Sequence, residues 1–174
     1  MSVILTAESA QNVYVPILRY YHKIISKYSQ EYDVPEHLIY AIIKTESDFR
    51  PRVISQAGAI GLMQMLPSTF EWLTGDEHLG EHLDVASLTD PDVSIRYGTY
   101  YLKYLMQKFP IVNTAIAAYN AGEGRVAKWL DTSEYSDGNG VLTYIPIEET
   151  RLYVEKVNSS MDHYKNLYYT TKEN

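Results

Sequence analysis

Glu46 is the residue of this sequence whose position most suggests chemistry. It follows an apolar run and lies three and four residues after Ile43 and Ile42. On a helix these spacings bring side chains to one face, so we expect the carboxyl group to share the inward face of the isoleucines. Burial raises a carboxyl pKa, and an acid that keeps its proton near neutral pH can act as a general acid. The alternative is a structural carboxylate that faces water or pairs with Lys44 or Arg50.

Three other segments combine turn residues with polar side chains. The stretch SQAGAIGLMQ at 55–64 contains two glycines and is expected to be a loop with tight turns, which could place backbone groups and Gln64 beside a ligand. The stretch AAYNAG at 117–122 ends an apolar helix with a tyrosine and an asparagine. The stretch IPIEETR at 145–151 places carboxylates in the first turn of a helix, where the helix dipole favours them. Each segment alone is more typical of an ordinary loop or helix cap.

Together, in this order and spacing, these segments resemble the catalytic domain of the soluble lytic transglycosylases. That family cuts bacterial peptidoglycan and has a goose-type-lysozyme-like helical fold. The resemblance covers about residues 20–165 and depends on the Glu46–Ser47 pair together with three motifs, GLMQ, AYNAG and PIEETR. It implies an all-α, lysozyme-like domain, and we expect residues 1–174 to form one such domain.

The resemblance also assigns roles to individual residues. Glu46 aligns with the single catalytic acid and base of the family. The expected substrate-binding positions are Ser55, Gln64, Leu66, Tyr119, Asn120 and Glu149. Two departures leave the preference for particular substrates open, since Leu66 and Val53 stand where the family often carries Met and Ala.

The implied reaction breaks the MurNAc-β-1,4-GlcNAc bond without water and leaves 1,6-anhydroMurNAc ends, with no cofactor and no metal. The residues themselves favour a scheme with one carboxylate, because Asp48 lies on a different helical face from Glu46. A hydrolytic muramidase of the same fold would use the same acid and let water attack. A non-catalytic peptidoglycan-binding module is disfavoured by the presence of Glu46.

A more distant alternative is a zinc peptidase. The sequence His78-Leu79-Gly80-Glu81-His82 has the H-x-x-E-H pattern. That chemistry needs both histidines on one helical face, about a turn apart. Gly80 within the motif makes a firm helix doubtful, so a solvated acidic loop is the preferred interpretation.

Composition limits the possible partners. The length of 174 residues suits one domain, and the net charge of −7 argues against non-specific nucleic-acid binding. No apolar run approaches the roughly 20 residues of a membrane span, and the segment 1–7 has no features of a signal peptide. The absence of cysteine excludes disulfides and thiolate zinc sites. What the family resemblance implies is a protein that binds peptidoglycan glycan strands in the cell envelope or outside the cell, in the periplasm or cell wall. We expect it to be a monomer, with the export signal absent from this chain.

The elements that must position these residues are almost all helical. Apolar periodicity and capping signals predict helices over 13–31, from Pro35 through Glu46, 67–73, from Asp90-Pro91 through Leu105, 111–118, 126–130 and 147–167. The stretches 48–66 and 74–90 are expected to be irregular, because glycine and proline interrupt the first and the second is acidic. Residues 138–143 could form one short β-hairpin.

Overall fold

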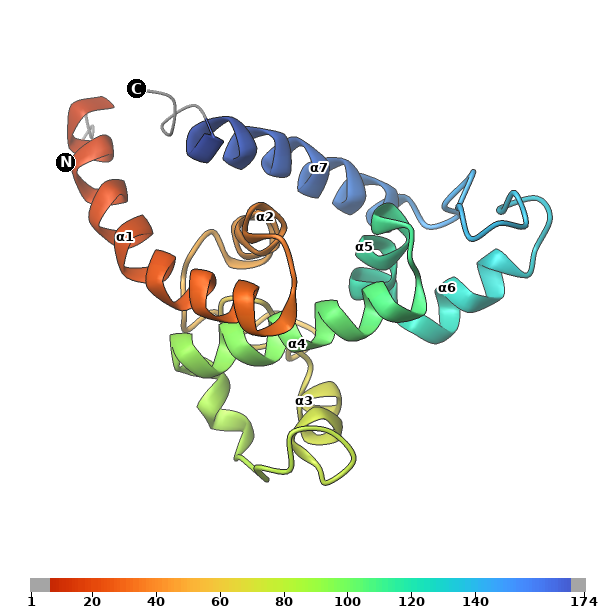
Figure 1. Ribbon diagram of the computed structural model, residues 1–174, viewed down its shortest axis with the longest axis horizontal. Coiled ribbons are helices and arrows are strands. Elements are labelled where there is room, and N and C mark those ends of the chain that lie inside the picture. The colour runs from red at the N-terminus through yellow and green to blue at the C-terminus, as the bar shows by residue number, and fades with distance from the viewer. Residues whose placement is uncertain (1–6, 170–174) are drawn as a thin grey trace.

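The computed structural model describes the backbone of residues 7–169 and the side chains of residues 20–166. Over this range the chain is helical, with only isolated β-bridges and no strand (Figure 1). The predicted all-α class is confirmed. None of the described helices is both long enough and apolar enough to cross a membrane. The helices are α1 Ala7–Tyr32, α2 Glu36–Ser47, α3 Pro67–Thr74, a 3-10 helix η1 Val85–Thr89, α4 Pro91–Lys108, α5 Val112–Ala121, α6 Glu123–Leu130 and α7 Glu148–Tyr169.

Helix α2 lies at the centre of the molecule, between α1 and α7 (Figure 1). Its six consecutive residues from Leu38 to Ile43 are each at most 2% exposed. A helix that is apolar on all sides must be surrounded on all sides, so α2 is a core helix rather than an amphipathic one. It ends at Asp48, whose left-handed backbone with φ 51° stops the helix. Glu46 is therefore carried by a helix that lies in the core.

The loop between α2 and α3 depends on a glycine. Gly61 has φ +84°, and a Cβ atom there would lie 2.1 Å from the backbone oxygen of Leu88 and 2.8 Å from Oγ of Ser94. Any other residue would therefore clash as well as strain the backbone. Isolated bridges join Ile60 to Ile54 and to Met65, which gives the loop a compact shape without a sheet.

Helix α4 begins as the sequence predicts. The side chain of Asp90 accepts a hydrogen bond from the Asp92 amide at 2.8 Å, and Pro91 is the first helical residue. The helix packs against α1 and α5, and its other side meets α3 and η1. A second, smaller core lies there, formed by Met65, Phe70, Leu73, Leu88 and Tyr97.

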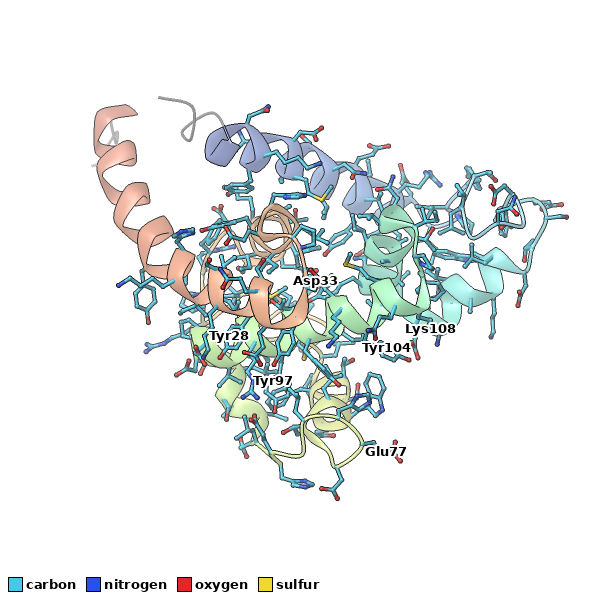
Figure 2. The ribbon with its side chains drawn as sticks, in the orientation of Figure 1. Tyr28, Asp33, Glu77, Tyr97, Tyr104 and Lys108 are labelled. Atoms are coloured by element: carbon cyan, nitrogen blue, oxygen red, sulfur yellow. The ribbon has the colours of Figure 1, made fainter. Side chains whose placement is uncertain are left out.

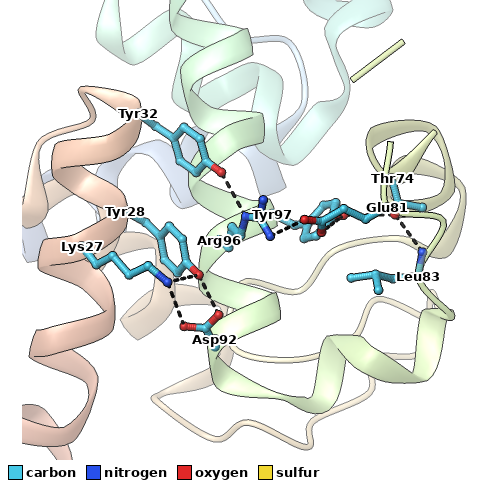
Figure 3. Close-up of polar contacts among 9 residues, drawn as sticks. All are labelled: Lys27, Tyr28, Tyr32, Thr74, Glu81, Leu83, Asp92, Arg96 and Tyr97. Carbon is cyan, nitrogen blue, oxygen red and sulfur yellow. Dashed lines mark hydrogen bonds and ion pairs between the residues drawn. The ribbon is translucent and has the colours of Figure 1, made fainter. Parts of the chain in front are cut away.

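The segment 74–90 is more ordered than its composition suggests. Figure 3 shows Glu81 in contact with two α4 residues: Nη1 of Arg96 lies 2.6 Å from Oε1, and the Tyr97 hydroxyl lies 2.8 Å from Oε2. Oγ1 of Thr74 accepts a hydrogen bond from the Leu83 amide at 2.9 Å. These bonds hold the segment on α4, and its end forms η1, which the sequence pattern did not predict.

Several boundaries differ from the expected ones. Helix α1 begins at Ala7 rather than 13, α6 begins at Glu123 rather than 126, and α5 continues to Ala121. The proposed hairpin over 138–143 is reduced to one bridge between Ser136 and Leu142. The reason is local: Oδ1 of Asp137 accepts hydrogen bonds from the amides of residues 139 and 141, which closes a tight turn in place of a ladder.

Candidate active site

Glu46 is the second-last residue of α2 and is half-buried. The hydroxyl of Tyr153, on α7, donates a hydrogen bond to its Oε1 at 2.7 Å. Burial raises the pKa of Glu46 to about 7, although the hydrogen bond from Tyr153 favours the charged form and opposes this rise. The predicted rise in the pKa is confirmed. At neutral pH the group is therefore poised between a proton donor and a proton acceptor.

The alternative ion pairs of Glu46 do not form. Lys44 pairs with Asp48 one turn further along, and Nε of Arg50 donates to the backbone oxygen of Ser47 at 2.9 Å. Glu46 is left with a neutral hydroxyl as its partner, so no neighbouring cation lowers its pKa. This combination, a half-buried carboxyl with a tyrosine as its neighbour, suits a group that must exchange a proton.

Tyr119, near the end of α5, lies close to Glu46. Its hydroxyl donates to the backbone oxygen of Met63 at 2.7 Å, which ties α5 to the loop before α3. Burial raises the pKa of Tyr119 well above its usual value, and the carboxylate of Glu46 raises it further. The phenol is thus a neutral group under all ordinary conditions, and Tyr119 also lines the cavity described below.

Asn120 joins α5 to the start of α7. Its Oδ1 accepts a hydrogen bond from Oγ1 of Thr150 at 2.8 Å. Two segments that the sequence marks separately, AYNAG and PIEETR, therefore meet in space. Glu149 precedes Thr150 and is exposed. Its carboxylate thus lies in solvent at the helix start that Asn120 contacts.

The side chains of Gln64 and Ser55 hydrogen-bond within the 55–64 loop and its flank. Nε2 of Gln64 donates to the backbone oxygens of Val53 and Gly61 at 3.0 and 2.9 Å, and Gln64 adopts a left-handed backbone with φ 47°. Oγ of Ser55 accepts a hydrogen bond from the Ala59 amide at 3.0 Å. The Gln64 amide group is therefore fixed in place by the turn around Gly61.

A cavity of about 290 Å³ lies beside Tyr119, and we call it the inner cavity. It brings together four of the seven predicted site residues. Glu46, Ser55 and Glu149 are not part of its lining. The lining residues are Gln64, Met65, Leu66, Thr69, Tyr101, Tyr119, Asn120, Ala121, Gly122 and Arg125.

The structure adds residues that the sequence analysis did not identify. Tyr153 contacts Glu46 directly, and Thr69, Tyr101 and Arg125 line the inner cavity. A signal existed for Tyr153, because it lies four residues after Glu149 on the same helix and so one turn into the motif-bearing segment. Tyr101 gave no such signal, since an aromatic residue at helical spacing is normally a core residue.

The side chains of the H-x-x-E-H pattern do not converge. His78 contacts the Trp72 ring at 4.1 Å between centroids, and His82 Nε2 lies 2.8 Å from Oδ1 of Asp76. Glu81 contacts Arg96 instead. The segment is not helical, and among the described residues no three His, Cys, Asp or Glu side chains lie together as metal ligands would. The geometry gives no support to a zinc peptidase.

Comparison with known proteins agrees with this geometry. The Transglycosylase SLT domain family matches residues 23–141. This chain belongs to that family. The soluble lytic murein transglycosylase of Escherichia coli K12 is 37% identical over 141 residues, which is 79% of this chain and 22% of that protein. Membrane-bound lytic murein transglycosylase C of Haemophilus ducreyi is 30% identical over 170 residues, which is 86% of this chain and 46% of that protein.

Solved structures share the fold. The 70 kDa soluble lytic transglycosylase of Escherichia coli matches with a TM-score of 0.75 and 35% identity, over 84% of this chain and 24% of that one. An inactive glutamate-to-glutamine mutant of lytic transglycosylase Slt from Pseudomonas aeruginosa matches with a TM-score of 0.70 and 34% identity, over 80% and 23%. The predicted lytic transglycosylase fold is confirmed. The chain spans less than a quarter of these soluble relatives.

Proposed function

We propose that this SLT-family chain is a lytic transglycosylase domain that cuts the MurNAc-β-1,4-GlcNAc bond of peptidoglycan and leaves 1,6-anhydroMurNAc ends. The observation that carries the proposal is Glu46, a half-buried carboxyl group that Tyr153 contacts and whose pKa burial raises to about 7, in a chain of this family. The inactive relative from Pseudomonas aeruginosa supports it, because a single glutamate-to-glutamine change accompanies the loss of activity in that protein.

The reaction requires one group that first gives and then takes a proton. Glu46 donates its proton to the oxygen that links the two sugars, and the bond from that oxygen to C1 of MurNAc breaks. The resulting carboxylate then takes the proton of the C6 hydroxyl of the same sugar, and the C6 oxygen bonds to C1. Protons balance, Glu46 is regenerated and no water is consumed. A pKa near 7 suits both halves of this exchange.

The surroundings of Glu46 favour this scheme over hydrolysis. An inverting hydrolase needs a second carboxylate, about 6.5–9.5 Å from the acid, to activate water. Burial and the hydroxyl of Tyr153 account for the pKa of Glu46, with no contribution from a second carboxylate. The lining of the inner cavity likewise contains no carboxylate. The C6 hydroxyl belongs to the same sugar as C1, so it reacts once it is positioned. Glu46 takes its proton, and no second carboxylate is needed.

The other predicted residues take supporting roles in the proposal. Tyr119 and Asn120 would contact the sugar at the reacting centre, and Gln64 and Leu66 would form the facing wall of the inner cavity. Tyr153 would keep the carboxyl group of Glu46 oriented. Ser55 and Glu149 would contact more distant parts of the glycan strand or its peptide stems. Because peptidoglycan is the substrate, the protein would act in the cell envelope.

Product analysis in heavy-oxygen water tests the proposal. Glycan strands are digested in H₂¹⁸O, and the ends are analysed by mass spectrometry, with the Glu46→Gln variant as the blank. A transglycosylase leaves unlabelled anhydro ends, which are one water lighter than reducing ends. Labelled reducing ends as the main product would instead identify a hydrolytic muramidase with the same acid. An absence of turnover would contradict both schemes.

A further inference from the structure

Helices α2 and α7 pack against each other (Figure 1), and residues of both line a cavity of about 340 Å³. This cavity shares no lining residue with the inner cavity. We call it the lysine cavity, and its lining consists of Lys44 and Thr45 from α2 and Lys156, Ser159 and Ser160 from α7. The reaction scheme uses none of these residues, so the lysine cavity has no role in the proposed function.

The composition of the lysine cavity is uniform in its chemistry. Each lining side chain ends in an ammonium group or carries a hydroxyl group. An ammonium group donates hydrogen bonds and accepts none, and a hydroxyl group can donate one. The chain as a whole has a net charge of −7, so a cavity lined in this way differs from the rest of the protein. Its donors suit an anion with several oxygen atoms, rather than a cation or an apolar ligand.

Helix geometry brings these donors together. Lys156, Ser159 and Ser160 are three and four residues apart, so they lie on one face of α7. Lys44 lies in the last turn of α2. The partial negative charge at the end of a helix opposes the binding of an anion, and a lysine in the last turn offsets it.

The charges around the lysine cavity do not cancel. Lys44 forms an ion pair with Asp48, whereas Lys156 has no ion-pair partner among the residues that the structure describes. Lys108, at the end of α4 (Figure 2), shows the contrast, because its Nζ lies 3.0 Å from Oε2 of Glu123. Two lysines and one aspartate leave one positive charge, which an anion with a single negative charge would balance.

Thr45 provides an independent observation. Its Oγ1 atom is buried and has no hydrogen-bond partner within the described part of the chain. Buried polar atoms in folded proteins are almost always paired. Rotation about χ1 exchanges the positions of the hydroxyl and methyl groups of a threonine. Since Thr45 lines the lysine cavity, an oxygen atom of a ligand there can supply the missing partner.

We propose that the lysine cavity binds a phosphate group with one negative charge, either free dihydrogen phosphate or a phosphodiester. Lys156 supplies the unbalanced charge, Lys44 a second ammonium group, and the three hydroxyl groups donate to the remaining oxygen atoms. Lysine binds phosphate as a point charge. A phosphate group has four oxygen atoms for these five donor groups, whereas a carboxylate has two. The site is independent of the transglycosylase function, because it uses no residue of that reaction.

Titration with potassium phosphate at pH 6, followed by ¹H–¹⁵N NMR, tests binding directly, with potassium chloride at the same ionic strength as the blank. At this pH dihydrogen phosphate is the main species. The amide signals of the five lining residues should shift and reach saturation. Shifts that are absent, that do not saturate, or that are equal with chloride would overturn the site.

A pair of lysine variants tests the assignment. Lys156→Gln should raise the dissociation constant for phosphate about three- to fivefold. Lys128→Gln is the matched control, because Lys128 is exposed on α6 and lines neither the inner cavity nor the lysine cavity. Its dissociation constant should equal that of the wild type. An equal effect of the two substitutions would show attraction to the whole surface and overturn the site.

Thr45→Val tests the buried hydroxyl group, since valine keeps the shape of threonine. Without phosphate, the variant should be at least as stable to urea as the wild type, because the hydroxyl has no partner to lose. With phosphate, it should bind more weakly. Unchanged affinity together with a clear loss of stability would contradict this role of Thr45.

Three further ligands identify the anion and its source. Acetate that binds as tightly as phosphate would overturn the assignment to phosphate. Glycerophosphoglycerol, a soluble phosphodiester, should shift the same amide signals if the ligand is esterified, and binding of free phosphate alone would identify the inorganic ion as the ligand. Binding to phosphatidylglycerol vesicles that Lys156→Gln leaves unchanged, with no binding of either soluble phosphate, would show membrane adsorption elsewhere and overturn the site.

Discussion

Replacing Glu46 with glutamine should stabilise the protein at alkaline pH while it abolishes activity. Burial raises the pKa of Glu46 from 4.5 to about 7 in the folded protein. The folded state therefore binds this proton more tightly than the unfolded state does. The resulting stability is fully present below pH 4.5 and is lost as the pH rises through about 7. Glutamine keeps the shape and an acceptor for Tyr153, but it has no proton to lose.

The size of the effect follows from the interval between the two pKa values. From 4.5 to about 7 the wild-type protein loses up to about 3 kcal/mol of its free energy of unfolding, at about 1.4 kcal/mol per pH unit. The glutamine variant avoids that loss. Its stability relative to the wild type should therefore rise between pH 4.5 and pH 8 by as much as about 3 kcal/mol.

Urea unfolding, followed by circular dichroism at pH 4.5 and pH 8, measures this difference. Glu155→Gln is the matched control, since it removes one negative charge from an exposed position on α7. Turnover of peptidoglycan by the Glu46→Gln variant should fall about 10²- to 10⁴-fold, the usual contribution of a general acid and base.

Two results would refute the reasoning. If the stability difference between Glu46→Gln and the wild type is the same at both pH values, Glu46 is not a half-buried acid with a raised pKa. If the variant keeps a tenth or more of wild-type turnover, Glu46 is not the proton donor, whatever its pKa. The two measurements are independent, because one reports the environment of the group and the other its role.

Three further changes have defined outcomes. Tyr153→Phe removes a hydrogen bond that favours the charged form of Glu46, so the pKa of Glu46 should rise further. The pH at which kcat/KM falls on the alkaline side should therefore move upward by about 1–2 pH units. If that pH does not change, the hydrogen bond does not influence the pKa of Glu46. Gly61→Ala should lower the free energy of unfolding by about 2–4 kcal/mol, because its Cβ would lie 2.1 Å from the Leu88 oxygen; urea unfolding checks this, and a neutral result would mean that the loop can move away. Prolonged chelation should leave turnover unchanged, and activity that is lost with chelator and restored by zinc would contradict a metal-free site.

Local patterns predicted the helices well because they report local physics. Apolar spacing marks the face that a helix buries, and Asp90-Pro91 marks a helix start without reference to the rest of the chain. Both were confirmed. The pattern failed where distant residues decide the outcome. The 3-10 helix η1 and the order of the 74–90 segment depend on Arg96 and Tyr97 of α4, which no local signal within the segment could reveal.

In the candidate site, too, some features follow from local sequence and others from contacts between distant residues. The sequence by itself determined that Glu46 ends an apolar helix, that its pKa should be raised, and that four motifs in order indicate one family. Only the tertiary structure decided that Tyr153, 107 residues away, is its partner, and that Asn120 meets Thr150 across 30 residues. The physical reason is that helix periodicity depends on neighbours within about one turn, whereas these contacts exist only once α2, α5 and α7 have packed against one another.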